Sequence, residues 1–375
     1  MSSPNKILLN ENIKSISPFK FDKVCQESTL SLQDNNNSFI PLNTLMTLFA
    51  SKKKGVTNIQ SCIIQNGPIL FDSFINRDNI LYCFTNKACT EQLLNFLNNT
   101  SKEMIEYIIS ELNGTFRGII KDKNGNVFCC ELFKICEENQ RIKILNELSD
   151  TMSEDCCNKY ASYPLQVLIE FSSCEKEYKL ILNSFNDQNK LLYASLDPIG
   201  SYVIKKIIEH IPEKFRIQFN LQFIKFITFI SMKKYGLINA KKFITFTKNE
   251  ENIKRIINLV LNNFINIATN NYGNYLIQYI LEKWHNISEI NDIKVVITDN
   301  FLILVQNRYS AFICDLFIKM ANIEEKKQLI TILNFNWNNN IYNINNNNNN
   351  NNIKNIMIKI NKSFETKKLK KKIKK

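Results

Sequence analysis

NNYGNYLIQYILE, the stretch from Asn270 to Glu282, places a small residue directly before an apolar helix pattern. Counted from Gly273, apolar side chains occupy the third, fourth, seventh and eighth positions, which are Leu276, Ile277, Ile280 and Leu281. Side chains at this spacing lie on one face of a helix with about 3.6 residues per turn. The stretch therefore predicts an amphipathic helix that begins next to Gly273.

The same combination of a small residue and a helical apolar pattern recurs along the chain. We call these small residues anchors, and they are Gly55, Cys89, Gly125, Ala161, Gly200, Gly236, Gly273 and Ser310. Successive anchors are separated by 34, 36, 36, 39, 36, 37 and 37 residues. Unrelated helices would not keep this regularity, so the period indicates a repeat protein.

Each anchor is preceded by a second amphipathic run, clearest from Ile253 to Leu261. We therefore predict units of two helices joined by a short link. One unit cannot bury its apolar stripe alone, whereas stacked neighbours bury a continuous core. Only eight glycines and seven prolines occur in 375 residues, so tight hairpin turns are scarce and an all-β fold is disfavoured. The predicted fold class is all-α, an α-solenoid of about eight helical repeats with one helix row on a concave face.

The repeat region is flanked and interrupted by segments of different composition. Residues 1–40 are polar and fit no repeat, so we expect them to be disordered. The repeats extend over residues 41–364, with an Asn-rich insertion at 338–352 that is too polar to pack. The Lys-rich tail at 365–375 contributes seven lysines to a net charge of +13, so the body is only mildly basic. Such a tail is a solvated charge run, a nuclear-targeting segment or a non-specific aid to phosphate binding.

The cysteine and histidine content argues against disulfides and against a metal site. The eleven cysteines are odd in number and no apolar leader precedes them, so we expect reduced, intracellular thiols. The adjacent pairs Cys129/Cys130 and Cys156/Cys157 cannot chelate as a CxxC motif does, and the chain has two histidines. The most apolar stretch, Leu221–Ile230, is too short to cross a bilayer. We therefore expect a soluble protein with no cofactor, no metal and no membrane partner.

Three stretches carry a resemblance to one known family. The stretch from Asn270 to Glu282 resembles a Pumilio (PUF) repeat, and LDPIGSYVIKKIIEHIP (196–212) and NRYSAFICDLFIK (307–319) fit neighbouring repeats of that family. The resemblance implies a right-handed, crescent-shaped solenoid that binds single-stranded RNA. It covers residues 70 to 364, through the period, the repeat order and the longer link before the last repeat.

The resemblance also numbers the repeats. The anchors from Cys89 to Ser310 mark repeats one to seven, and the Asn-interrupted segment is repeat eight. Gly55 then belongs to a capping half-repeat.

Three positions on the helix after each anchor suit base recognition. Unpaired RNA bases offer flat faces that stack on aromatic side chains, and edges that hydrogen-bond to polar side chains. Residues one and five positions after an anchor project to the same face of the helix, so both can reach one base edge. We call these the first and second edge positions. The residue two positions after the anchor lies beside them, and we call it the stacking position.

Repeats six and three have complete sets at these positions. In repeat six they are Asn274, Tyr275 and Gln278, and the resemblance implies that this set binds uracil. In repeat three they are Ser162, Tyr163 and Gln166, and the resemblance assigns this set to adenine.

Tyrosine recurs at the stacking position of repeats three, four and six, as Tyr163, Tyr202 and Tyr275. One isolated tyrosine is more often a half-buried packing residue. The stacking position lies off the apolar stripe, however, so packing gives no reason to repeat an aromatic side chain there. The shared register therefore favours stacking on a base.

Repeats four and five carry lysine at the second edge position. Repeat four has Ser201, Tyr202 and Lys205. Lysine cannot accept a hydrogen bond and suits a phosphate or a base acceptor. Repeat five has Leu237, Ile238 and Lys241, and its first two residues can contact a base only through apolar surface.

The remaining repeats depart further from the complete pattern. Repeat seven has Ala311, Phe312 and Asp315, and the resemblance implies that the carboxylate accepts from guanine. Repeat two has Asn126, Val127 and Cys130. Repeat one has Thr90, Glu91 and Leu94. Repeats one and two are therefore expected to be poor base readers.

Taken with the antiparallel direction of family complexes, the resemblance implies a spaced RNA element, 5′-U-N-N-A-3′. We expect a cytoplasmic monomer that binds messages and recruits effector proteins through its convex face, to repress translation or promote decay. One alternative is an assembly factor for ribosomal RNA in the nucleus or nucleolus, for which degenerate repeats and a Lys-rich tail would be natural. A second alternative is a protein scaffold without RNA binding. Enzymatic activity is not expected, because no catalytic constellation is recognisable in the sequence.

Overall fold

The computed structural model describes residues 76–85, 87–338 and 358. The chain divides into two units, Met1–Asn66 and Gly67–Lys375, and all described residues belong to the second. Those residues form helices α4 to α23 and one 3-10 helix, η1, and contain no strand. The all-α prediction is therefore confirmed. The segment 1–40, the Asn-rich tract beyond residue 338, the Lys-rich tail, repeat eight and the Gly55 half-repeat lie outside the described residues.

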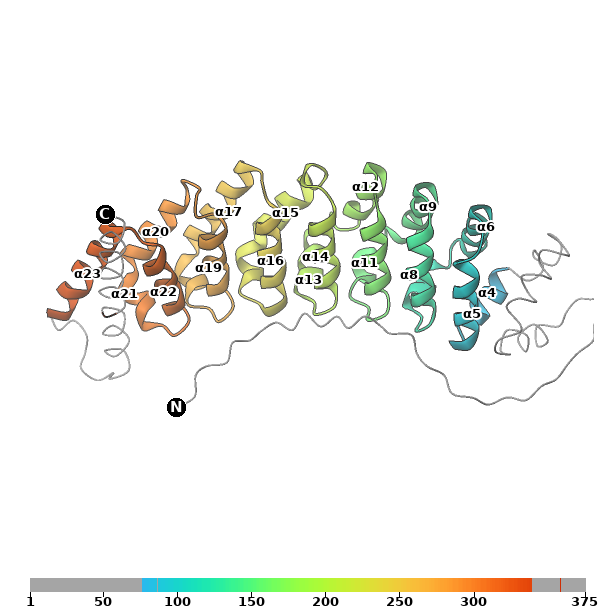
Figure 1. Ribbon diagram of the computed structural model, residues 1–375, viewed down its shortest axis with the longest axis horizontal. Coiled ribbons are helices and arrows are strands. Elements are labelled where there is room, and N and C mark those ends of the chain that lie inside the picture. The colour runs from blue at the N-terminus through green and yellow to red at the C-terminus, as the bar shows by residue number, and fades with distance from the viewer. Residues whose placement is uncertain (1–75, 86, 339–357, 359–375) are drawn as a thin grey trace, which may run out of the picture. The chain divides into compact units, whose positions relative to one another are not determined.

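Apart from repeats four and five, each repeat contains a first, a second and a third helix (Figure 1). The first helices are α4 (Arg77–Cys83), α7 (Phe116–Lys121), α10 (Met152–Asp155), α13 (Gln188–Leu196), α18 (Phe264–Ala268) and α21 (Phe301–Gln306). The second helices are α5 (Lys87–Leu97), α8 (Gly125–Ile135), α11 (Ser162–Phe171), α14 (Gly200–His210), α16 (Lys234–Phe246), α19 (Asn274–Lys283) and α22 (Ala311–Met320). The third helices are α6 (Lys102–Leu112), α9 (Glu138–Leu148), α12 (Glu175–Asn183), α17 (Glu250–Asn262), α20 (Ile290–Asp299) and α23 (Ile323–Asn338).

Repeats four and five share a longer helix. After η1 (Glu213–Phe215), α15 (Ile217–Ser231) runs from the third-helix position of repeat four to the first-helix position of repeat five. It is 15 residues long, and six of its apolar side chains, distributed from Phe219 to Ile230, are buried. The continuous run therefore leaves no break at which two shorter helices would separate.

The predicted two-helix unit was wrong, because the run before five of the anchors is broken into a third helix and a short first helix; these anchors are Gly125, Ala161, Gly200, Gly273 and Ser310. Between α6 and α7 the break lies at Gly114, whose φ of 81° is in the left-handed region that glycine favours. Between α17 and α18 it lies at Asn263, whose side-chain amide donates to the Leu259 carbonyl. A first helix such as α18, with five residues, is too short to show an apolar period of its own.

The helices pack in rows that follow the order of the repeats (Figure 1). Each second helix contacts the second helix of the next repeat, from α5 to α22, and we call this set the second-helix row. The third helices form another row, in which α15 fills the place between α12 and α17. Large side chains between the rows are fully buried, among them Phe128, Phe133, Phe223 and Phe243. The core is therefore continuous from repeat to repeat, as the apolar stripes predict.

The anchors are small because the second helix starts against the end of the first. A Cβ atom on Gly273 would lie 2.5 Å from the carbonyl oxygen of Ile267, six residues earlier. The same contact would be 2.4 Å at Gly236 and 2.7 Å at Gly125. Ser310 fits the place differently, because its hydroxyl donates to the Leu304 carbonyl at 2.7 Å. The anchor thus fixes where the second helix begins, and hence where its edge and stacking positions point.

Candidate nucleic-acid interface

An Asp or Asn three residues before the anchor holds the start of most second helices. Oδ1 of Asn270 accepts hydrogen bonds from the backbone N–H groups of Tyr272 and Gly273, both at 2.9 Å. Oδ1 of Asp197 does the same for Ile199 and Gly200, at 2.8 and 2.7 Å. Equivalent bonds are made by Asp122, Asn158 and Asn307. These residues were not predicted from the sequence, although Asp or Asn recurs three residues before five anchors and is typical of helix starts.

The stacking positions form a line of exposed side chains along the second-helix row. Tyr163, Tyr202, Tyr275 and Phe312 are 61%, 52%, 48% and 56% exposed. Val127 and Ile238 occupy the same position in repeats two and five and are also exposed. Six consecutive repeats therefore present an aromatic or aliphatic side chain to solvent at one register. We call this line the stacking ladder.

In repeat six the two edge residues are bonded to each other beside Tyr275. Asn274 is 1% exposed, and its amide nitrogen donates to the carbonyl of Asn270 at 2.9 Å. Its Oδ1 accepts from Nε2 of Gln278, also at 2.9 Å. Within the described residues Oε1 of Gln278 receives no hydrogen bond, so it can accept one from a ligand. The pair is thus held in place before any ligand arrives.

Repeat three has a similar arrangement with a serine at the first edge position. Nε2 of Gln166 donates to both the hydroxyl and the carbonyl oxygen of Ser162, each at 3.2 Å. The Ser162 hydroxyl donates across the repeat boundary to the carbonyl of Ile199 at 3.4 Å. The exposed ring of Tyr163 lies next to this pair in sequence. The structure therefore bonds the two predicted edge residues of repeat three to each other and exposes its predicted stacking residue.

The edge residues of repeats one and two are occupied by local contacts. Thr90 is 3% exposed and donates its hydroxyl to the Cys83 carbonyl at 2.9 Å. Asn126 donates its amide to the carbonyls of Asp122 and Lys123, at 2.8 and 2.7 Å. Burial raises the pKa of the Cys130 thiol to about 12, so it remains a neutral, weak acceptor. In this structure the polar groups of Thr90 and Asn126 therefore bond to backbone carbonyls close to them in sequence.

The central and last repeats present charged groups at the second edge position. Lys205 and Lys241 are half-buried in repeats four and five, and Asp315 is half-buried in repeat seven. Among their first edge residues, Ser201 is 5% and Leu237 is 9% exposed. The burial of Leu237 makes its apolar side chain part of the packing between helices.

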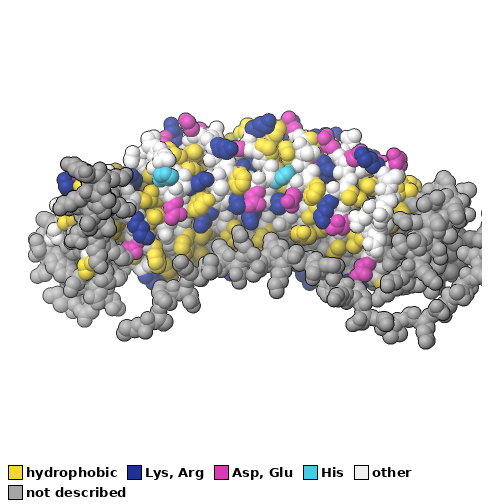
Figure 2. Space-filling view, in the orientation of Figure 1, with side chains coloured by type: hydrophobic (Ala, Val, Ile, Leu, Met, Phe, Trp, Pro, Cys, Tyr) yellow, Lys and Arg dark blue, Asp and Glu magenta, His cyan; other side chains and the backbone are white. Residues whose placement is uncertain are grey.

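Charges of both signs are mixed on the face seen in Figure 2. Many of them form ion pairs between neighbouring repeats, such as Lys190–Glu154 at 3.2 Å and Lys206–Glu170 at 3.0 Å. Arg141 and Glu177 form a pair between repeats two and three that is buried, with a distance of 2.6 Å. These pairs join neighbouring repeats, and the Lys and Arg side chains in them are less available to bind an anionic ligand.

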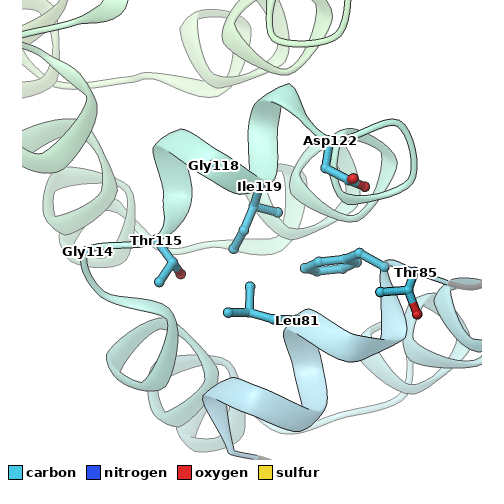
Figure 3. A pocket seen from close by; sticks show the side chains of 8 residues that line it. Leu81, Thr85, Gly114, Thr115, Gly118, Ile119 and Asp122 are labelled. Carbon is cyan, nitrogen blue, oxygen red and sulfur yellow. The ribbon is translucent and has the colours of Figure 1, made fainter.

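A pocket lies between α4 and α7 (Figure 3). Leu81, Phe84 and Ile119 give it an apolar wall, and Thr85, Thr115 and Asp122 add polar groups. The Asp122 carboxylate already accepts from the backbone of the α8 start. The pocket therefore shares no edge or stacking residue with the candidate interface.

These features define a class of protein: an α-helical repeat array that presents one stacking side chain and two edge side chains per repeat. The model of the Pumilio-family RNA binding repeat matches residues 195–219 and 263–286, which include the anchors Gly200 and Gly273. The RNA-binding domain of yeast Puf5p, solved bound to AAT2 RNA, aligns with a TM-score of 0.66 and 18% identity. The alignment covers 75% of this chain and 83% of that chain.

Other comparisons agree. The Puf4 RNA binding domain, solved bound to a recognition sequence from the HO endonuclease RNA 3′ UTR, aligns with a TM-score of 0.62 and 18% identity, over 68% of this chain and 78% of that one. Pumilio homolog 12 of Arabidopsis thaliana is 17% identical over 233 residues, which are 60% of this chain and 38% of the relative. Pumilio homolog 11 is 22% identical over 227 residues, which are 58% of this chain and 39% of the relative. The matched region thus spans about two-fifths of these relatives. Together the matches show that two stretches of the chain, residues 195–219 and 263–286, are similar to the Pumilio-family RNA binding repeat, and that the fold is similar to that of the yeast Puf5p domain.

No helix within the described residues is long and apolar enough to cross a membrane.

Proposed function

We propose that the chain binds single-stranded RNA along the second-helix row, with uracil at repeat six and adenine at repeat three. The observation that carries this proposal is the geometry of repeat six, where the exposed ring of Tyr275 lies beside the bonded pair Asn274–Gln278. A base that stacks on the ring brings its edge to two amides. The Gln278 carbonyl can accept from uracil N3–H, and an amide N–H can donate to a uracil oxygen.

The same reasoning supports adenine at repeat three. Glutamine can accept from the adenine amino group and donate to a ring nitrogen, and Gln166 is held toward this edge by Ser162. If the RNA runs antiparallel to the protein chain, the two repeats select the element 5′-U-N-N-A-3′.

The biological role that we propose is the control of messages in the cytoplasm. Several solved relatives are bound to recognition sequences from 3′ UTRs, including those of the HO endonuclease and Cox17 RNAs. In this proposal a monomer contacts RNA with its second-helix row, while effector proteins bind the third-helix row and repress translation or promote decay.

Selection from a randomised RNA pool, followed by sequencing, tests the proposal. We expect enrichment of U and A separated by two positions. The double variant Asn274→Ala/Gln278→Ala should lose the preference for U and keep the preference for A. Gln188→Ala removes an exposed glutamine from α13, a first helix, and should change neither preference, so it is the matched control.

Flat base preferences with salt-sensitive binding would contradict the selective model and favour a ribosomal RNA assembly role. Nucleolar accumulation with crosslinks to ribosomal precursors would support the same alternative. Absence of RNA binding would favour a protein scaffold.

A further inference from the structure

Repeats four and five lie between the two repeats with complete base-reading sets, and both carry lysine at the second edge position. Their second helices, α14 and α16, contact each other directly, so Lys205 and Lys241 occupy equivalent places on neighbouring helices. An ammonium group offers three donors and no acceptor. It therefore complements an anionic oxygen better than the mixed donor and acceptor edge of a base.

Lys241 is held in place by an aromatic ring and not by a carboxylate. Its Nζ lies 4.7 Å from the ring centre of Tyr279, which belongs to the next repeat. The Tyr279 hydroxyl is in turn 2.6 Å from Oγ1 of Thr245 on α16. Within the described residues no carboxylate oxygen lies within 4.0 Å of this Nζ. A cation–π contact positions the ammonium without neutralising it, so the charge is available to a ligand.

Lys205 shares one weak carboxylate partner with a neighbour. Its Nζ is 3.9 Å from Oε1 of Glu209, and the same oxygen is 2.7 Å from Nζ of Lys242. Glu209 is therefore neutralised mainly by the closer Lys242. Lys206 is paired with Glu170 at 3.0 Å. The four lysines at this boundary thus face two carboxylates, which leaves an excess of two positive charges.

The other positions of these repeats can hold a base but cannot select one. Tyr202 and Ile238 are 52% and 47% exposed and offer surfaces for stacking or apolar contact. Ser201 is almost buried, and Leu237 has no polar side-chain atom. At the second edge position both repeats carry lysine, which can donate but not accept, so neither repeat has the two amide side chains of repeat six.

We propose that Lys205 and Lys241 bind the phosphates of the two spacer nucleotides, so that repeats four and five hold the RNA backbone without reading its bases. The inference rests on the proposed function, because it requires RNA on the second-helix row. It gives the two N positions of 5′-U-N-N-A-3′ a physical basis: phosphate contacts add affinity and fix the register, and base contacts specify.

The test measures binding of a short RNA with the U-N-N-A element by fluorescence anisotropy at several salt concentrations. The variants are Lys205→Gln, Lys241→Gln and their combination. Each loss should weaken binding roughly twofold to fivefold, equally for all spacer bases. The slope of log affinity against log salt should fall by about 0.7 for each lysine. Lys248→Gln removes an exposed lysine before α17 and is the control of equal charge, with no expected change in slope.

A second arm replaces the spacer phosphates of the RNA with neutral methylphosphonates. The wild-type protein should bind this RNA more weakly than the natural RNA. The double lysine variant should bind the two RNAs with equal affinity. Glu209→Gln removes the shared carboxylate and should strengthen binding of the natural RNA.

The possible failures are distinct. If selectivity for U and A persists while the lysine variants behave as Lys248→Gln does, the phosphate assignment is overturned and the proposed function stands. If the lysine variants change the preference for spacer bases, the ammonium groups contact base acceptors and the phosphate assignment is overturned. If the protein binds no RNA, the proposed function and this inference both fail.

Discussion

Two glycine-to-alanine substitutions are expected to change stability in opposite directions. At Gly273 the new Cβ would lie 2.5 Å from the Ile267 carbonyl oxygen and 3.1 Å from the Ile267 Cγ2 atom. The backbone of Gly273 is helical, with φ of −57° and ψ of −35°, so alanine suits the conformation and only the contact opposes it. At Gly118, inside α7, a Cβ would meet no atom within 4 Å.

The magnitudes follow from these contacts. Forcing an additional carbon into a packed site costs about 1–3 kcal/mol. Replacing glycine by alanine raises the free energy of unfolding by about 0.4–1 kcal/mol, because the unfolded chain loses conformational freedom. Gly273→Ala should therefore lower the free energy of unfolding by about 1–2 kcal/mol. Gly118→Ala should raise it by about 0.4–1 kcal/mol, since only the second effect applies.

Urea denaturation followed by circular dichroism measures both changes. Native-state hydrogen exchange should localise the loss in Gly273→Ala to α18 and α19, because neighbouring repeats contribute largely independent interface energies. The close-packing explanation of the anchors would be refuted if Gly273→Ala were as stable as the wild type. It would also be refuted if both variants shifted in the same direction by the same amount.

Three further outcomes are expected. Tyr275→Ala should weaken binding of a U-N-N-A RNA by ~1–3 kcal/mol in affinity titrations, because a stacking contact is lost. The control is Tyr193→Ala, which removes a tyrosine that is 66% exposed on α13 and should leave the affinity unchanged. Equal losses for the two variants would contradict a role of the stacking ladder in RNA binding. Asn270→Ala should destabilise repeat six by ~1 kcal/mol in urea titrations, because two backbone N–H groups lose their acceptor, and Asn270→Asp should retain most of the stability. Burial raises the pKa of Cys130 to about 12, so this thiol favours the folded state at neutral pH and stability should fall as pH rises above the usual thiol pKa of about 8.5. Cys130→Ala should show a smaller decline in urea titrations between pH 8 and 10, and an unchanged decline would argue against this contribution.

The second helices could be predicted from sequence because their apolar stripes repeat at helical spacing. Leu276, Ile277, Ile280 and Leu281, the residues that defined the pattern, are all fully buried. The short first helices could not be predicted in this way, because fewer than three turns leave no distinct period. The single helix α15, which spans the boundary between repeats four and five, could not be predicted either, since an uninterrupted apolar run does not show where one repeat ends.

For the candidate interface, the sequence predicted which side chains are exposed but not which atoms they contact. Exposure of Tyr275 follows from its place off the apolar stripe, and the structure shows it. The contact between Asn274 and Gln278 requires the side-chain geometry, because helical spacing brings residues near without stating which atoms meet. The partners of Lys205 and Lys241 could not be predicted at all, since they depend on residues from neighbouring helices.

The burial of the first edge position explains how recognition can be lost repeat by repeat without loss of the fold. Asn274 and Ser162 are as buried as a core residue, yet Leu237 occupies the same place in repeat five and is buried as well. A polar residue there must find hydrogen-bond partners within the helix, while leucine is stabilised by apolar contact alone. Packing therefore tolerates or even favours the apolar replacement, and only a ligand opposes it. Under our proposal, repeat six retains Asn274 because a base uses its edge, and repeat five can carry Leu237 because the RNA there is held by its phosphate.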